Sequence, residues 1–106
     1  MVSQDILTKI KEAILSVMPD SEIILFGSQA RGDATGDSDI DLLVLVDNEK
    51  DKLSYDEKSV IIEALFNLEM ECGLEINPIM RTRKQWFNIP CRTPFYINVI
   101  NEGIKL

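Results

Sequence analysis

Two apolar runs, residues 22–26 and 40–46, constrain the fold more than any other feature of this chain, because a short polar segment separates them. The second run is almost continuously apolar, which predicts a central strand covered on both faces. Gly27 permits an unusual backbone turn directly after the first run, and Ser28 can cap a short helix that extends to about Arg31. The expected order is therefore a strand, a tight turn, a short helix and a second strand.

Helices are predicted on both sides of this unit. Apolar residues recur at helical spacing over residues 3–17, where Ser3 is placed to cap the helix. They recur again over residues 55–72, where Ser54 and Glu57 form a capping box. The chain therefore pairs its apolar strands with at least two amphipathic helices.

The C-terminal third is predicted to hold shorter elements. Residues 74–80 form a third strand, which Pro78 places at a sheet edge or a strand end. One helical turn is expected at 81–88. A last helix begins at Pro94 and ends before Gly103. Helices and strands thus alternate along the chain.

The composition excludes several classes of function. The sequence contains no histidine, which removes Ser-His-Asp and Cys-His catalysis and histidine-based zinc sites. The net charge of −7 argues against broad binding to nucleic acid and suits metal ions, metal-bound nucleotides or a basic partner protein, although acidity can also serve solubility alone. No apolar run approaches the ~20 residues that span a bilayer. We expect one cytoplasmic domain over residues 1–106, with Cys72 and Cys91 as free thiols.

Asp39 and Asp41 are the candidate metal ligands. Two residues apart on a strand, their side chains point to the same face, and a divalent cation relieves the repulsion between them. Oxygen ligands of this kind suit Mg²⁺ or Mn²⁺ rather than zinc. A two-metal site generally needs a further carboxylate, and Glu75 is the best candidate because it lies in an apolar run where a charge is otherwise costly. The alternative is a pair of strand-edge carboxylates that cap local backbone groups.

Gly27, Ser28 and Arg31 are the candidate phosphate-binding residues. Glycine lets the backbone approach phosphate closely, the hydroxyl of Ser28 is a donor, and Arg31 adds a cation one turn later. Neither a Gly-Ser turn nor an Asp-x-Asp pair is specific alone. Their joint placement, ten residues apart between two strands, indicates chemistry on a nucleoside triphosphate.

Two further features have a structural and a functional interpretation. The basic segment 81–84 is either a solvated turn or a contact to phosphates or a partner. Trp86 either packs against the sheet or stacks on a base. The structural interpretation is favoured in both cases.

Gly27-Ser28, ten intervening residues and Asp39-Ile40-Asp41 resemble the signature of the DNA polymerase β-like nucleotidyltransferase superfamily. The longer string Gly-Ser-Gln-Ala-Arg-Gly-Asp…Ser-Asp-Ile-Asp-Leu-Leu-Val is similar to its minimal members, the MNT proteins. The likeness covers most of the chain, including the Asn-Glu-Gly segment at 101–103. It implies an α+β nucleotidyltransferase fold, with a small mixed, largely antiparallel sheet flanked by helices, rather than the parallel sheet that alternating helices and strands suggest.

The resemblance also implies roles for the site residues. Gly27 and Ser28 would bind the triphosphate of ATP or another nucleoside triphosphate, and Asp39 and Asp41 would hold two Mg²⁺ ions, with Mn²⁺ as an alternative. The family's third carboxylate, often aspartate, maps to Glu75, which would share one ion and accept the proton of the attacking hydroxyl. The implied reaction is transfer of a nucleoside monophosphate.

For the acceptor, the resemblance implies a protein. MNT proteins of this size commonly act beside a HEPN protein as a toxin–antitoxin pair and transfer AMP to a tyrosine of the HEPN ribonuclease. A rival hypothesis is a non-catalytic antitoxin that neutralises its partner by contact alone. Transfer to a small molecule such as an aminoglycoside is a third. Competent residues at every main motif position favour the enzyme.

Overall fold

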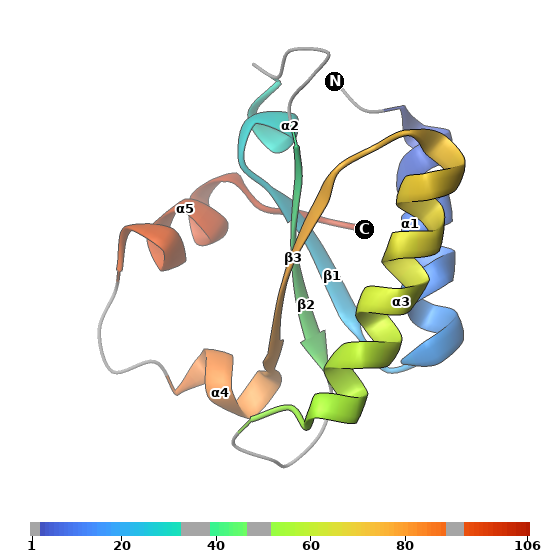
Figure 1. Cartoon of the computed structure of the whole chain (residues 1–106). Coiled ribbons are helices and arrows are strands. Elements are labelled where there is room, and N and C mark those ends of the chain that lie inside the picture. The colour runs from blue at the N-terminus through green and yellow to red at the C-terminus, as the bar shows by residue number, and fades with distance from the viewer. Residues whose placement is uncertain (1–2, 33–38, 47–51, 89–92) are drawn as a thin grey trace.

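The computed structural model shows one mixed β-sheet with helices on both of its faces (Figure 1). It describes residues 3–32, 39–46, 52–88 and 93–106. The helices are α1 (Gln4–Val17), α2 (Ser28–Arg31), α3 (Tyr55–Cys72), α4 (Arg83–Phe87) and α5 (Pro94–Glu102). α1 and α3 pack together on one face, and α4 and α5 lie on the other. Within these ranges, no helix combines the length and the apolar character needed to cross a membrane.

Four strands form the sheet in the order β3-β2-β1-β4. Their bounds are β1 (Glu22–Phe26), β2 (Ile40–Val46), β3 (Ile76–Thr82) and β4 (Ile104–Lys105). β1 is antiparallel to both β2 and β4, whereas β2 and β3 are parallel. The predicted α+β fold with a mixed sheet is confirmed, and so are the central place of β2 and the edge position of β3.

Side-chain caps explain where the main helices begin. Ser3 accepts a hydrogen bond from a backbone N–H in the first turn of α1 at 3.3 Å. At the start of α3, the N–H of Glu57 donates to Ser54 at 3.1 Å, and the N–H of Ser54 donates to the Glu57 carboxylate at 3.0 Å. Thr93 caps α5 in the same way, at 3.2 Å. Each cap satisfies backbone donors that have no partner within the helix.

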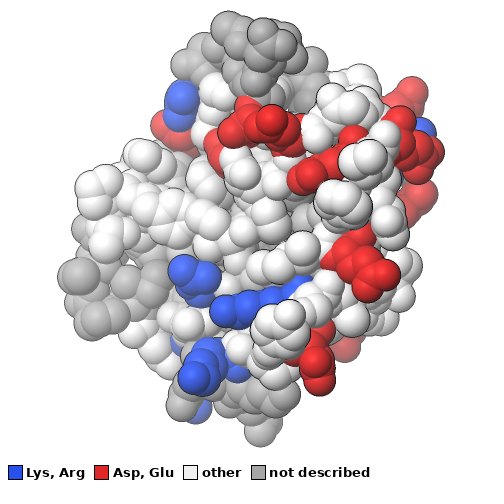
Figure 2. Space-filling model, in the orientation of Figure 1, with Lys and Arg blue, Asp and Glu red and all other residues white. Residues whose placement is uncertain are grey.

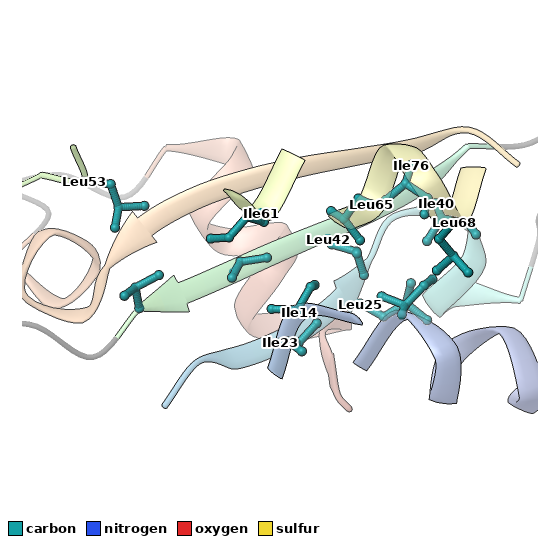
Figure 3. Packing of buried hydrophobic residues seen from close by; sticks show 13 residues of the cluster. Ile14, Ile23, Leu25, Ile40, Leu42, Leu53, Ile61, Leu65, Leu68 and Ile76 are labelled. Carbon is teal, nitrogen blue, oxygen red and sulfur yellow. The ribbon is translucent and has the colours of Figure 1, made fainter. Parts of the chain in front are cut away.

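The strand β2 is buried on both faces, and its alternation assigns each residue to one of them. The residues that face α1 and α3 are Ile40, Leu42, Val44 and Val46, and they share a core with Ile14, Ile61 and Leu65 (Figure 3). Leu43 and Leu45 face the other way and pack with Trp86 of α4 and Val99 of α5. By the same alternation, Asp41 lies on the α4–α5 side of the sheet.

The interpretation of Trp86 as a packing residue is confirmed. Its side chain is buried, and its ring centroid lies 5.9 Å from that of Phe95 and 5.0 Å from that of Tyr96. These aromatic contacts join α4 to α5 across the sheet face.

Three local details differ from the sequence predictions. β3 begins at Ile76 and continues to Thr82, so Glu75 immediately precedes the strand, because pairing with β2 starts at Ile40 and Ile76. Ser28 does not cap α2; Gly27 holds the cap position, without a side-chain hydrogen bond. The strand β4 was not predicted, because two exposed residues show no alternation. Cys72 is free, and Cys91 and residues 33–38 and 47–51 lie outside the described residues.

Candidate active site

The ends of the three longer strands meet around the predicted site residues. Pairing places Phe26, the last residue of β1, opposite Asp41, and it places Asp41 opposite Asn77 of β3. Because β1 ends where β2 begins, the turn at Gly27 follows directly beside Asp41. Strand register therefore brings the predicted phosphate turn to the predicted metal pair.

Gly27 lies against the carboxylate of Asp41. Its φ is 78°, in the left-handed region that side chains other than glycine rarely adopt. A Cβ atom built on Gly27 would lie 2.5 Å from Asp41 Oδ2, which is too close for a real contact. The backbone conformation and the space beside it both require glycine. A phosphate held by this turn would therefore be a near neighbour of the Asp41 carboxylate.

Asp39 and Glu75 form the second pair of neighbours. The N–H of Ile40 donates to the carbonyl oxygen of Glu75 at 2.9 Å, as expected where the parallel pairing of Ile40 with Ile76 begins. The pKa of Glu75 is raised above its ordinary value, because its protonated form can hydrogen-bond to Asp39 and because the charge of Asp39 opposes ionisation. A smaller contribution comes from the charge of Glu69. Two acidic groups that repel each other are thus held together at the strand ends.

Asn77 is a site residue that sequence analysis missed. Its Nδ2 donates a hydrogen bond of 2.9 Å to Asp39 Oδ2. The available signal was the alternation of Glu75 and Asn77, which matches that of Asp39 and Asp41 and predicts side chains on one face. An uncharged amide is less costly within an apolar run than a carboxylate, so the sequence alone does not single it out.

The donor set fits a hard divalent cation. Within the described residues, no three Asp, Glu, Cys or His side chains converge closely enough to form a ready-made cage. The close pair of Asp39 and Glu75 is nevertheless an arrangement that a cation stabilises, because it replaces their repulsion by attraction. Asp41 lies on the same sheet face, beside the turn. Carboxylate oxygens of this kind suit Mg²⁺ or Mn²⁺.

Arg31 faces α5. Its Nη1 lies 3.0 Å from Glu102 Oε2, in an ion pair that joins the last residues of α2 and α5. Ser28 is half-buried at the first position of α2, next to Gly27. The structure thus brings Ser28 to the turn and directs the Arg31 guanidinium toward Glu102.

Charges of opposite sign occupy opposite ends of β3. Figure 2 shows acidic surface where β2 and β3 begin, in the region of Asp39, Asp41 and Glu75, and basic surface near the start of α4. The basic residues of that region are Arg81, Arg83 and Lys84. Arg81 belongs to β3 and donates to the carbonyl oxygen of Met80 at 2.8 Å. The acidic end is therefore the end that suits cations.

Comparison with known proteins agrees with this geometry. The nucleotidyltransferase domain family matches residues 7–105 of the chain. Two proteins of Methanocaldococcus jannaschii, both provisionally named protein adenylyltransferases, are similar in sequence. One is 38% identical over 82 residues, which are 77% of this chain and 73% of that protein. The other is 31% identical over 104 residues, which are 96% of each chain.

Solved structures share the fold at lower sequence identity. A toxin–antitoxin complex with AMP-PNP matches with a TM-score of 0.64 and 22% identity, over 92% of this chain and 69% of that chain. A provisionally named nucleotidyltransferase from Sulfolobus solfataricus matches with a TM-score of 0.62 and 20% identity, over 95% and 76% of the two chains. A variant of the toxin–antitoxin pair MntA–HpeT, in which two aspartates are glutamates, matches with a TM-score of 0.61 and 19% identity, over 92% and 69%. The match of the family model over residues 7–105 shows that this chain belongs to the nucleotidyltransferase domain family.

Proposed function

We propose that the protein is a Mg²⁺-dependent nucleotidyltransferase that moves AMP from ATP onto a hydroxyl of a partner protein and so acts as an antitoxin. One observation supports this above all. The pairing of β1, β2 and β3 gathers the Gly27 turn, Asp41, Asp39 and Glu75 at one end of the sheet. A phosphate-binding turn beside clustered carboxylates is what transfer from a metal-bound triphosphate requires.

The residues of the chain have separate tasks in this reaction. Gly27 and Ser28 bind the phosphates, and Asp39, Asp41 and Glu75 hold the divalent ions. When bound, such ions lower the pKa of the attacking hydroxyl and neutralise charge on the departing pyrophosphate. The two aspartates and Glu75 thereby orient the triphosphate with its α-phosphorus toward the acceptor.

Atoms balance as follows in the transfer. A bond forms between the acceptor oxygen and the α-phosphorus, and the bond from that phosphorus to the oxygen bridging to the β-phosphate breaks. Pyrophosphate leaves with the electron pair. The proton of the acceptor hydroxyl passes to the carboxylate of Glu75.

The names of similar proteins support the choice of a partner protein as the acceptor. The M. jannaschii proteins are provisionally named protein adenylyltransferases, and two solved structures of this fold are toxin–antitoxin pairs, one of them with AMP-PNP. Together with the resemblance to MNT proteins, these names support ATP as donor and a tyrosine of a HEPN-family toxin as acceptor. The net charge of −7 suits a basic partner of this kind.

The position of the transferred phosphate distinguishes this reaction from its rivals. A HEPN-family protein of the same organism is incubated with this protein, Mg²⁺ and ATP labelled at either the α- or the γ-phosphate. We expect the partner to gain label from α-labelled ATP only, and to gain the mass of an adenylyl group. The double variant Asp39→Ala/Asp41→Ala should transfer nothing, whereas Asp5→Ala, which removes an exposed carboxylate of α1, should be fully active.

Other outcomes would contradict the assigned metal ligands or favour a different function. If the double variant still modified the partner, the assignment of the metal ligands would be wrong. A tight complex without any modification would favour the non-catalytic antitoxin that acts by contact alone. Label from γ-labelled ATP would indicate a kinase instead.

A further inference from the structure

Helix α3 presents an apolar face that neither the core nor the candidate active site uses. Ile62, Phe66 and Met70 are spaced four residues apart, so their side chains form one line along the helix. They are 50%, 55% and 72% exposed, respectively. Single exposed apolar residues are normal on a soluble protein, but a line of three large ones marks an interaction site. We refer to Ile62, Phe66 and Met70 as the α3 outer face.

The α3 outer face lies on the opposite side of the sheet from Asp41, although Glu69, near its C-terminal end, is close enough to Glu75 for its charge to raise the pKa of that group. α3 covers the sheet face to which Ile40 and Leu42 contribute, whereas Asp41 points to the opposite face. Figure 1 shows α3 beside β3, the strand at this edge of the sheet. A protein bound to the outer face would therefore leave the Gly27 turn open to nucleotide.

The neighbouring edge of β3 is protected against strand addition. The N–H of Ile76 donates to Glu69 Oε1 at 3.0 Å, and the N–H of Thr82 donates to Gln85 Oε1 at 3.3 Å. Between them, Pro78 has no N–H to offer. An incoming strand would lose its partners at these three positions. The element that fits beside α3 is therefore a helix.

Carboxylates border the α3 outer face. Glu63 and Glu69 each lie three residues from Phe66, one toward each end of the helix. Glu63 makes no hydrogen bond or ion pair within the part of the chain that the structure describes. The helix as a whole carries one lysine, Lys58, and five carboxylates: Asp56, Glu57, Glu63, Glu69 and Glu71. The charge complementary to this surface is positive.

A second copy of this chain would not supply the positive charge that complements this surface. Antiparallel self-pairing of α3 centred on Phe66 would bring Glu63 of each copy level with Glu69 of the other, so carboxylates of both copies would gather at one contact. Each copy would also bring the same excess of carboxylates to the contact. Like charges so placed oppose association.

We propose that the α3 outer face docks a partner protein through an amphipathic helix whose apolar ridge is bordered by lysine or arginine. The acceptor protein of the proposed function is the expected partner, so the inference rests on that function for the partner's role. The chemistry of the surface is independent of it. Phe66 is the central anchor, and Glu63 and Glu69 select for basic flanks.

A synthetic peptide tests the surface directly. The probe is a fluorescent helical peptide of about five turns, with leucines along one face and lysines on both sides of them. We expect wild-type protein to bind it, and Phe66→Asp to weaken binding about tenfold or more. Glu63→Lys should also weaken binding, and the affinity should fall as salt is added. In the matched control, Ile100→Asp makes the same change at a 59% exposed isoleucine of α5 and should leave binding unchanged.

Several results would overturn the proposal. One is equal binding of the peptide to wild type and to Phe66→Asp; another is equal binding of a peptide in which glutamates replace the lysines. A dimer in sedimentation that Phe66→Asp converts to a monomer would assign the face to a second copy. Met70→Asp, at the most exposed of the three positions, replaces Phe66→Asp if circular dichroism shows that variant unfolded. The Asp39→Ala/Asp41→Ala variant should bind the peptide normally, so failure of docking is distinguished from failure of the catalytic proposal.

Discussion

Asn77 holds the carboxylate of Asp39 through a hydrogen bond of 2.9 Å from Nδ2 to Oδ2. Asn77 also pairs with Asp41 in the register of β2 and β3. Because β3 is the edge strand, Asn77 flanks the two aspartates on the edge side of the sheet. An amide at this place fixes the orientation of one ligand without adding charge to a site that already concentrates carboxylates. Such partners orient the ligands and so tune metal affinity.

We therefore expect Asn77→Ala to weaken Mg²⁺ or Mn²⁺ binding by about tenfold to a hundredfold, the range typical for loss of a ligand's hydrogen-bond partner. Because Asn77 is exposed, the melting temperature without metal should change little. Titration calorimetry of the metal-free protein measures the affinity. Asn101→Ala, which shortens an exposed asparagine of α5, is the matched control. Unchanged metal affinity in Asn77→Ala would show that Asp39 needs no such support.

Replacing Gly27 should damage the turn even with the smallest side chain. In Gly27→Ala, the new methyl group would meet Asp41 Oδ2, and the backbone would remain at a φ of 78° that alanine disfavours. We expect the protein to lose at least ~1 kcal/mol of stability and to bind ATP more weakly, because Asp41 must move. Chemical denaturation and ATP binding measure the two effects. Gly32→Ala is the control, since it has a similar φ of 83° and open space around it. If both variants bound ATP equally weakly, backbone strain rather than the contact with Asp41 would explain the loss.

The stability of the metal-free protein should depend on the protonation of Glu75. Its folded-state pKa is raised above the ordinary value of 4.5, chiefly by the hydrogen bond to Asp39, so the folded chain holds this proton more tightly than the unfolded chain does. The stabilisation is present below pH 4.5 and is lost as the pH rises through the folded-state pKa. In a chelator, the melting temperature of wild type should therefore fall over this window relative to Glu75→Gln. Added Mg²⁺ should cancel the difference at the upper end of the window. If the melting temperatures of the two proteins in chelator changed with pH in parallel, the raised pKa of Glu75 would be contradicted.

Two roles of Arg31 can be tested separately: the ion pair with Glu102 and the predicted contact to the triphosphate. An exposed pair of this kind contributes about 0–1 kcal/mol, so a double-mutant cycle with Arg31→Gln and Glu102→Gln should give a coupling energy within that range. If Arg31 also contacts the triphosphate, as the sequence predicts, Arg31→Gln weakens ATP binding and Glu102→Gln does not. ATP titrations of the two single variants decide this. Equal effects on ATP binding would show that the arginine only braces α2 against α5.

Local signals in the sequence were sufficient for most of the secondary structure. Capping residues such as Ser54 and Thr93 act within one turn of the chain, so their effect can be predicted without knowing the fold. The strand β2 could be predicted from its own apolar run. The start of β3 could not, because residues 74 and 75 have strand character and only the pairing of Ile40 with Ile76 excludes them from the strand.

The features of the candidate site also fall into those that the sequence determines and those that the tertiary structure determines. The sequence by itself determined the chemistry of the site, with a glycine turn, two spaced aspartates and no histidine, because these are properties of residue type and local spacing. Only the tertiary structure decided which groups meet: Asp39 with Asn77 and Glu75, Asp41 with Gly27, and Arg31 with Glu102. Those contacts join residues far apart in the chain and depend on strand register and direction, and a shift of one residue would turn each side chain to the other face of the sheet.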